Sequence, residues 1–288
     1  MCHAPRRRRA ESRRDRVALL SLGLLLAGCK QGAVDAKLDE GFRKVFEPRK
    51  TPQQYMLVAV SSDDPDARRD AVAKISQSKK FNQEWSIKGL VAIALLENEP
   101  QTRCVALRTL ARTGDPRATE TALKILNYTE YPPQEVWPPA AICRGDAALA
   151  LARLTEGNQV PEEYRDQAFN TLLERLKRDD DRHTRIAAAR GLGCYPRAET
   201  IPALIDGLRD EDFAVAHECE NSLVKLTGVT HNADAGAWEA WLAEHPDDAF
   251  AQAGTVPESR RPPYKNRWEK GWYETKDMVE WLWPGAKE

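Results

Sequence analysis

The stretch Arg185-Ile-Ala-Ala-Ala-Arg-Gly-Leu-Gly193 decides the fold of this chain, because its pattern recurs along the sequence. It holds an arginine, an alanine three residues later and a leucine four residues after the alanine. On an α-helix the alanine and the leucine share one face, and the small alanine allows a neighbouring helix to approach closely. The stretch therefore predicts a helix that packs against others of its kind.

The pattern returns at nearly constant intervals of 35, 41, 41 and 31 residues, and its last copy has lost the arginine. The copies are Arg68/Ala71/Ile75, Arg103/Ala106/Leu110, Arg144/Ala147/Leu151, Arg185/Ala188/Leu192 and Ala216/Cys219/Leu223. Recurrence at this interval is typical of solenoids built from pairs of helices.

Further apolar residues at helical spacing precede the later copies, around positions 85–95, 118–126, 164–176 and 201–208. Asp-Pro at 115–116 is typical of a helix start, and Gly114, Gly157 and Gly228 follow the repeated segments as stop signals. We predict an all-α fold, an α-solenoid of about five helix pairs over residues 51–228, closed by a Trp-rich C-terminal cap.

The repeated segments resemble HEAT repeats. The resemblance is carried by D-P-R-A at 115–118, V-A-L-R-T-L at 105–110 and R-I-A-A-A-R-G-L-G at 185–193, and it extends over residues 51–228. It implies an α-solenoid that acts as a scaffold or binding module, and it does not identify a partner.

The first residues are typical of an export signal. Arginines are concentrated before the apolar run Val17–Leu26, and Leu26-Ala27-Gly28-Cys29 follows. This tetrapeptide resembles the lipobox of bacterial lipoproteins, which implies cleavage between Gly28 and Cys29 and lipidation of the Cys29 thiol. Lys30 follows this cysteine, and by resemblance to proteobacterial lipoprotein sorting a residue other than Asp at this position implies the outer membrane, where the source has one.

These signals divide the chain into four parts: a lipoprotein signal peptide (1–28), a lipidated tether (29–50), the solenoid (51–228) and the cap or tail (229–288). Removal of residues 1–28 would leave 36 basic against 42 acidic residues. Since nucleic-acid binders carry an excess of basic residues, we expect protein partners, membrane contact through the lipid, and no nucleic acid.

The four repeated arginines, Arg68, Arg103, Arg144 and Arg185, form a structural ladder in this interpretation. We expect them to bind carbonyls and carboxylates of neighbouring repeats, with Asp63 and Asp180 as nearby acids. An anion-binding groove is the alternative.

Residues suited to catalysis are sparse. His217-Glu218 resembles one of the paired His-Glu motifs of deoxyhypusine hydroxylase, a HEAT-like di-iron enzyme, but that family uses several such pairs. We expect no catalytic residue, no metal and no cofactor, and a HEAT-framed enzyme that uses His217 and Glu218 stays open as an alternative.

Four cysteines besides Cys29 follow the signal: Cys104, Cys143, Cys194 and Cys219, all predicted in second helices. Helix axes lie ~8–10 Å apart, which rarely brings two Cα atoms within the ~7 Å that a disulfide tolerates. We expect buried free thiols, and the alternative is one disulfide, with Cys104 and Cys143 as the best pair.

Two aromatic segments are candidates for interaction. The proline-rich stretch 127–139 carries Tyr131 and Trp137, and the tail holds six of the eight tryptophans, including Trp268, Trp272 and Trp281. The tail is predicted to be a cap, and the alternative is a binding patch for glycan or cell wall. The predicted function is a non-catalytic, lipid-anchored scaffold or interaction module of the cell envelope.

Overall fold

The computed structural model of the chain describes residues 50–127, 139–255, 257 and 268. The chain divides into two compact units, Met1–Lys50 and Thr51–Glu288, and every helix described below belongs to the second unit. Several predicted features lie outside the described residues: the signal peptide with Gly28 and Cys29, the tether up to residue 49, and Tyr131, Trp137, Trp272 and Trp281.

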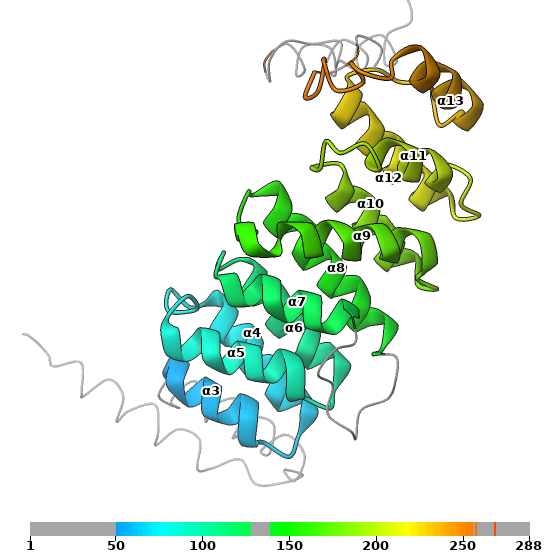
Figure 1. Ribbon diagram of the computed structural model, residues 1–288. Coiled ribbons are helices and arrows are strands. Elements are labelled where there is room, and N and C mark those ends of the chain that lie inside the picture. Colours follow the sequence, from blue (N-terminus) through cyan, green and yellow to red (C-terminus); the bar gives the residue numbers. More distant parts are fainter. Residues whose placement is uncertain (1–49, 128–138, 256, 258–267, 269–288) are drawn as a thin grey trace, which may run out of the picture. The chain divides into compact units, whose positions relative to one another are not determined.

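Helices dominate the ranges 50–127 and 139–255, and these ranges contain no strand (Figure 1). The first helices of successive pairs are α3 (Pro52–Ser61), α5 (Glu84–Leu96), α7 (Pro116–Asn127), α9 (Arg165–Arg178) and α11 (Thr200–Gly207). The second helices are α4 (Pro65–Gln77), α6 (Pro100–Ala111), α8 (Ala141–Glu156), α10 (Arg182–Leu192) and α12 (Phe213–Thr227). A short 3₁₀ turn, Glu162–Tyr164, precedes α9, and α13 (Ala235–Glu244) follows the last pair.

The pairs stack in two layers. Each first helix contacts the first helix of the next pair, and each second helix contacts the next second helix. The helix α13 contacts α11 and so continues the first layer beyond the fifth pair. Stacking in which each repeat contacts its neighbours defines a solenoid, so the predicted fold class is confirmed.

Local sequence sets where the helices begin and end. Side chains of N-cap residues accept hydrogen bonds from the first-turn backbone of six helices: Thr51, Asp64, Glu99, Asp181, Asp212 and Asp234. At the other end, Gly228 stops α12 with φ +75°, and a Cβ there would lie 2.6 Å from the Gln252 carbonyl oxygen. Only glycine fits this turn, because both the backbone conformation and the space exclude a side chain.

The core lies between the two layers and follows the repeated pattern. The alanine position and the apolar position four residues later are buried in all five copies, with Cys219 in place of alanine in the last. The sequence analysis found no apolar pattern that predicts α3, the first helix of the first pair. Two of its apolar side chains, Leu57 and Val60, are exposed.

Two further observations bear on the sequence predictions. Cys194 lies in the turn after α10 and not in a second helix, because α10 ends at Leu192 and Gly193 is its C-cap. Among the described residues, no helix combines the length and the apolar character needed to cross a membrane.

Candidate functional site

Arg185 joins the fourth helix pair to the fifth. Its Nη1 donates hydrogen bonds to the carbonyl oxygens of Asp179 (2.9 Å) and Asp180 (3.3 Å), just before its own helix α10. Its Nε and Nη2 bind both carboxylate oxygens of Asp210, at 2.8 and 3.1 Å, ahead of α12. The planar guanidinium suits this bidentate contact with a carboxylate. The hydrogen bonds to Asp210 raise the pKa of Arg185.

Arg68 makes the same contacts in the first pair. Its Nη1 donates to the carbonyl oxygens of Ser62 (2.8 Å) and Asp63 (3.2 Å), and its Nε and Nη2 bind the Glu97 carboxylate at 3.0 Å each. Glu97 stands ahead of α6, the second helix of the following pair. The arginine therefore holds the start of its own helix and the start of the next second helix together.

Arg144 is the most deeply buried example of this contact. Its Nη1 donates to the carbonyl oxygen of Pro139 at 2.7 Å, and its Nη2 donates to Asp179 Oδ1 at 3.0 Å. It also pairs with Asp180, and Arg175 reaches the other oxygen of Asp179 at 3.5 Å. Since the Asp179 side chain has no exposed surface, these cations compensate a charge that water does not reach.

The accepting carboxylates share one position, two residues before the N-cap of the next second helix. Each also accepts the N-cap backbone N–H: Glu97 from Glu99, Asp179 from Asp181 and Asp210 from Asp212, at 2.9–3.0 Å. The sequence prediction named Asp63 and Asp180 as the acids near Arg68 and Arg185. The structure differs, since Asp63 and Asp180 offer these arginines their backbone carbonyls and the carboxylates come from the next repeat.

Arg103 binds the backbone of α5. It is buried, and its Nε donates to the carbonyl oxygen of Ala94 at 2.9 Å, within its own helix pair.

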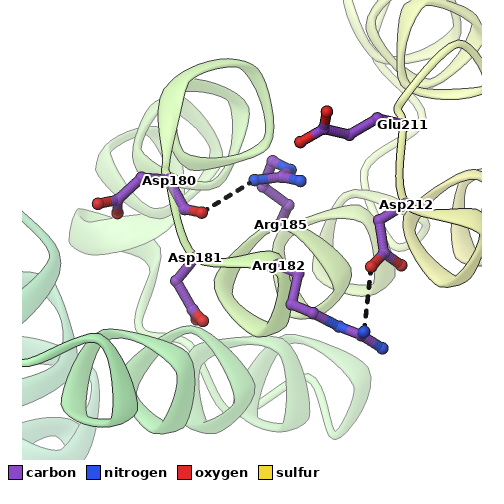
Figure 2. A pocket seen from close by; sticks show the side chains of 6 residues that line it. All are labelled: Asp180, Asp181, Arg182, Arg185, Glu211 and Asp212. Carbon is purple, nitrogen blue, oxygen red and sulfur yellow. Dashed lines mark hydrogen bonds and ion pairs between the residues drawn. The ribbon is translucent and has the colours of Figure 1, made fainter.

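A pocket of about 500 Å³ opens beside the last arginine of the ladder (Figure 2). Its lining comes from the starts of α10 and α12: Asp180, Asp181, Arg182, Arg185, Glu211 and Asp212. Arg182 Nη1 lies 3.1 Å from Asp212 Oδ2, so both arginines of the pocket already have partners. Four of the six lining residues are acidic, so the charge of the pocket is predominantly negative.

A second cavity is a groove of about 590 Å³ over the second helices. It is lined by Arg108 of α6, by Ile142, Gly145, Asp146 and Leu149 of α8, by Asp181 before α10, by His183, Ile186, Ala187 and Arg190 of α10, and by Glu218 of α12. Residues three, four and seven apart share a helix face, which explains why α8 and α10 each contribute a stripe.

Three apolar side chains line the groove, and we refer to Ile142, Leu149 and Ile186 as its floor. Ile142 is 48% exposed, and Leu149 and Ile186 are half-buried. Burying such side chains against a partner contributes about 25 cal/mol for each Å² of apolar surface removed from water. The groove therefore offers a surface that gains free energy when another molecule covers it.

The charges of the rim are largely matched within the protein. Arg108 contacts Asp146 through two N···O pairs of 3.1 and 2.8 Å, and Arg190 contacts both oxygens of Glu156 at 2.7 and 2.8 Å. These hydrogen bonds raise the pKa of Arg108 and lower the pKa of Glu156. His183 is exposed at the same surface. The rim thus presents fixed charges of both signs around an apolar floor.

The structure does not join His217 and Glu218 into an acid–base pair. The exposed imidazole of His217 stacks on the ring of Phe213 with centroids 5.9 Å apart, whereas Glu218 lines the groove. Successive residues of a helix point in different directions, which separates the two groups. The described residues also contain no cluster of three or more ligands that could hold a metal.

Of the groove residues, the sequence predictions included only Glu218, as a member of the alternative His217/Glu218 pair. The Arg/Ala/Leu pattern marks the buried face of each second helix, whereas Ile142 and Ile186 lie on the neighbouring face. A usable signal was present: these apolar residues stand on second helices outside the repeated pattern.

Residues 169–253, from α9 to beyond α13, match the family model of HEAT repeats. The chain contains a HEAT-like repeat domain. Among solved structures, a designed armadillo repeat protein is similar to this chain with a TM-score of 0.46 and 14% identity, over 70% of this chain and 95% of that one. No curated protein matches the sequence. The HEAT match covers the part of the solenoid that supplies α10 and α12 to the groove.

Proposed function

We propose that this protein is a lipid-anchored interaction module of the cell envelope, which binds a protein partner in the groove over α6, α8, α10 and α12. The observation that carries the proposal is the groove itself, with its apolar floor of Ile142, Leu149 and Ile186 inside a charged rim. Solenoids commonly use the surface formed by successive repeats as an extended binding site.

The paired charges of the rim favour the binding of a partner. Arg108 and Arg190 are held by Asp146 and Glu156, and Asp181 Oδ2 accepts both the backbone N–H and the hydroxyl of Thr184 at 2.8 Å. Groups fixed in this way provide shape and complementary charge for a partner. A general acid or base requires a group that can exchange a proton with a substrate, which these pairs do not supply.

The groove part of the proposal is tested by comparing two glutamate substitutions in the membrane-anchored chain. Ile142→Glu introduces a charge on the apolar floor, and Asn170→Glu places the same charge on exposed α9 in the other layer. Proteins that co-purify with the chain from crosslinked envelopes should be lost with Ile142→Glu and retained with Asn170→Glu. Equal retention by both variants, each with a normal thermal melt, would contradict a role for the groove.

The anchor rests on the lipobox-like Leu26-Ala27-Gly28-Cys29. Metabolic labelling with a fatty-acid probe should mark the chain, and Cys29→Ala should abolish the label, prevent lipoprotein-type cleavage and release the protein from membranes. Unchanged label on the Cys29→Ala chain would overturn the anchor and leave the groove proposal standing.

One observation favours a second function, the stacking of glycan on tail tryptophans. Trp268 is 89% exposed, and exposed indole rings are common sugar-stacking surfaces. Sedimentation of the chain with purified cell-wall glycan should then depend on Trp268. If Trp268→Ala sediments as the parent chain does, this second function is excluded at Trp268.

A further inference from the structure

Two buried thiols meet between the second helices α6 and α8. Cys104 on α6 and Cys143 on α8 are both almost without exposed surface. The Cys104 thiol donates to the carbonyl oxygen of Ile142 at 3.5 Å, and the Cys143 thiol donates to the carbonyl oxygen of Pro100 at 3.6 Å. Each sulfur thus touches the backbone of the helix that carries the other.

This exchange of contacts brings the two cysteines close together. The carbonyl of Ile142 belongs to the planar peptide unit that ends at the Cα of Cys143, so the Cys104 sulfur lies beside the Cys143 backbone. The two thiols are close enough for each to act on the pKa of the other. A disulfide tolerates Cα atoms up to ~7 Å apart, and the crossed contacts place the two cysteines opposite each other in the α6–α8 contact.

The surroundings of the pair distinguish its two members. The hydrogen bond from Cys104 lowers the pKa of Cys143, and the positive charge of Arg103 acts in the same direction. The same hydrogen bond, together with burial, raises the pKa of Cys104. The thiolate therefore forms first at Cys143, which makes this sulfur the attacking group in thiol–disulfide exchange.

We propose that Cys104 and Cys143 form a disulfide that links the second helix pair to the third. During a local opening of the α6–α8 contact, the Cys143 thiolate attacks a disulfide-containing oxidant and displaces one oxidant thiolate. Cys104 then loses its proton, attacks the Cys143 sulfur and displaces the second. The two thiols of the protein lose two protons and two electrons, and the oxidant leaves as two thiols.

The remaining cysteines of the described residues are placed differently. Cys219 is buried against Gly207, and burial raises the pKa of Cys219 to about 12. Cys194 lies in the turn after α10, where its sulfur is 3.0 Å from Lys225 Nζ. Neither shows a contact with another cysteine among the described residues, so oxidation is selective for the α6–α8 pair.

The disulfide would close a loop over residues 104–143, which includes α7. It would also fix Cys143, the residue next to Ile142, whose side chain lines the groove. Closing a loop of this length restricts the unfolded chain, so the oxidised protein should melt about 5–10 °C above the reduced one.

The test uses the purified full chain, equilibrated in glutathione buffers of oxidising or reducing composition. After blocking with N-ethylmaleimide in denaturant, trypsin releases Cys104 in peptide 104–108 and Cys143 in peptide 125–144. We expect these two peptides to be joined, with the mass of two hydrogen atoms lost, only in the oxidised sample. The peptides of Cys194 and Cys219 should carry the maleimide.

Serine variants supply the controls. Cys143→Ser should lose both the joined peptide and the rise in melting temperature, whereas Cys219→Ser should keep the joined peptide. Maleimide on both Cys104 and Cys143 in the oxidised parent chain, or a link from either to another cysteine, would overturn the inference. In the cell, the oxidant would come from the proposed envelope location. The glutathione experiment does not depend on that location, so the disulfide and the envelope location can fail separately.

Discussion

The indole Nε1 of Trp238 donates a hydrogen bond of 2.6 Å to Oε2 of Glu220, and both side chains are buried. The hydroxyl of Thr230 donates to the other oxygen of the carboxylate at 2.5 Å. A buried carboxylate on the last second helix is thus satisfied by the segment that follows it, which is how α13 closes the end of the solenoid.

Removing this indole should destabilise the protein strongly. Trp238→Ala leaves a cavity and takes a donor from the buried Glu220 carboxylate, so the free energy of unfolding should fall by about 3–5 kcal/mol. Denaturant titration measures it. Trp268→Ala, at a ring that is 89% exposed, is the matched control and should change stability by less than about 0.5 kcal/mol. Equal losses in the two variants would contradict the closing role of Trp238.

The buried part of the arginine ladder should matter more than its exposed neighbours. Arg144→Met leaves Asp179 buried with less compensation and should cost about 3–5 kcal/mol of unfolding free energy. Arg182 is about half exposed and pairs with Asp212, so Arg182→Met should cost no more than about 1 kcal/mol. The account of the ladder is wrong if urea midpoints show the two variants to be equally stable.

A charged side chain should not be tolerated at the buried alanine position of each repeat. Ala147 and Ala188 are fully buried between stacked helices, so Ala147→Asp and Ala188→Asp should each lower the free energy of unfolding by at least about 3 kcal/mol. Ala141→Asp makes the same change at an exposed first-turn position of α8 and should be tolerated, since a negative charge is favourable there. Thermal melts followed by circular dichroism compare the three.

The repeat pattern was sufficient to predict the fold. Ala and Leu at a fixed spacing form one apolar face on each second helix, and stacking of the repeats buries that face. The ladder could be predicted only in part. Arg185 was identifiable from its recurrence, but its carboxylate partner Asp210 lies in the next repeat, 25 residues away, and local sequence favoured Asp180. The groove depends on which face of α8 meets α10, so the sequence could mark Ile142 only as an apolar residue outside the repeated pattern, and the packing shows that it lines a groove.

The ion pair between Glu156 and Arg190 should give a small pH dependence. Arg190 lowers the pKa of Glu156 in the folded protein, so the pair stabilises the fold above the unfolded pKa of about 4.3. That contribution is lost as the pH falls through the folded value. Because the Arg190 side chain is 43% exposed, Arg190→Gln should cost at most about 1 kcal/mol at pH 7.

The same pair can be checked with its carboxylate removed. The stability difference between the parent chain and Arg190→Gln should disappear once the pH is below the folded pKa of Glu156, and it should be absent at every pH in a Glu156→Gln background. Urea titrations between pH 3 and 7 provide the measurement. A difference that persists at low pH would show that Arg190 acts through other contacts.

The most direct test of the groove as a protein-binding surface is site-specific photocrosslinking in living cells. A photoreactive amino acid in place of His183, which is exposed at the groove, should give a discrete protein adduct that Ile142→Glu removes. The same amino acid in place of Asn170, exposed on α9, should give none. Equal adducts at the two positions, or no protein adduct at His183, would contradict the account.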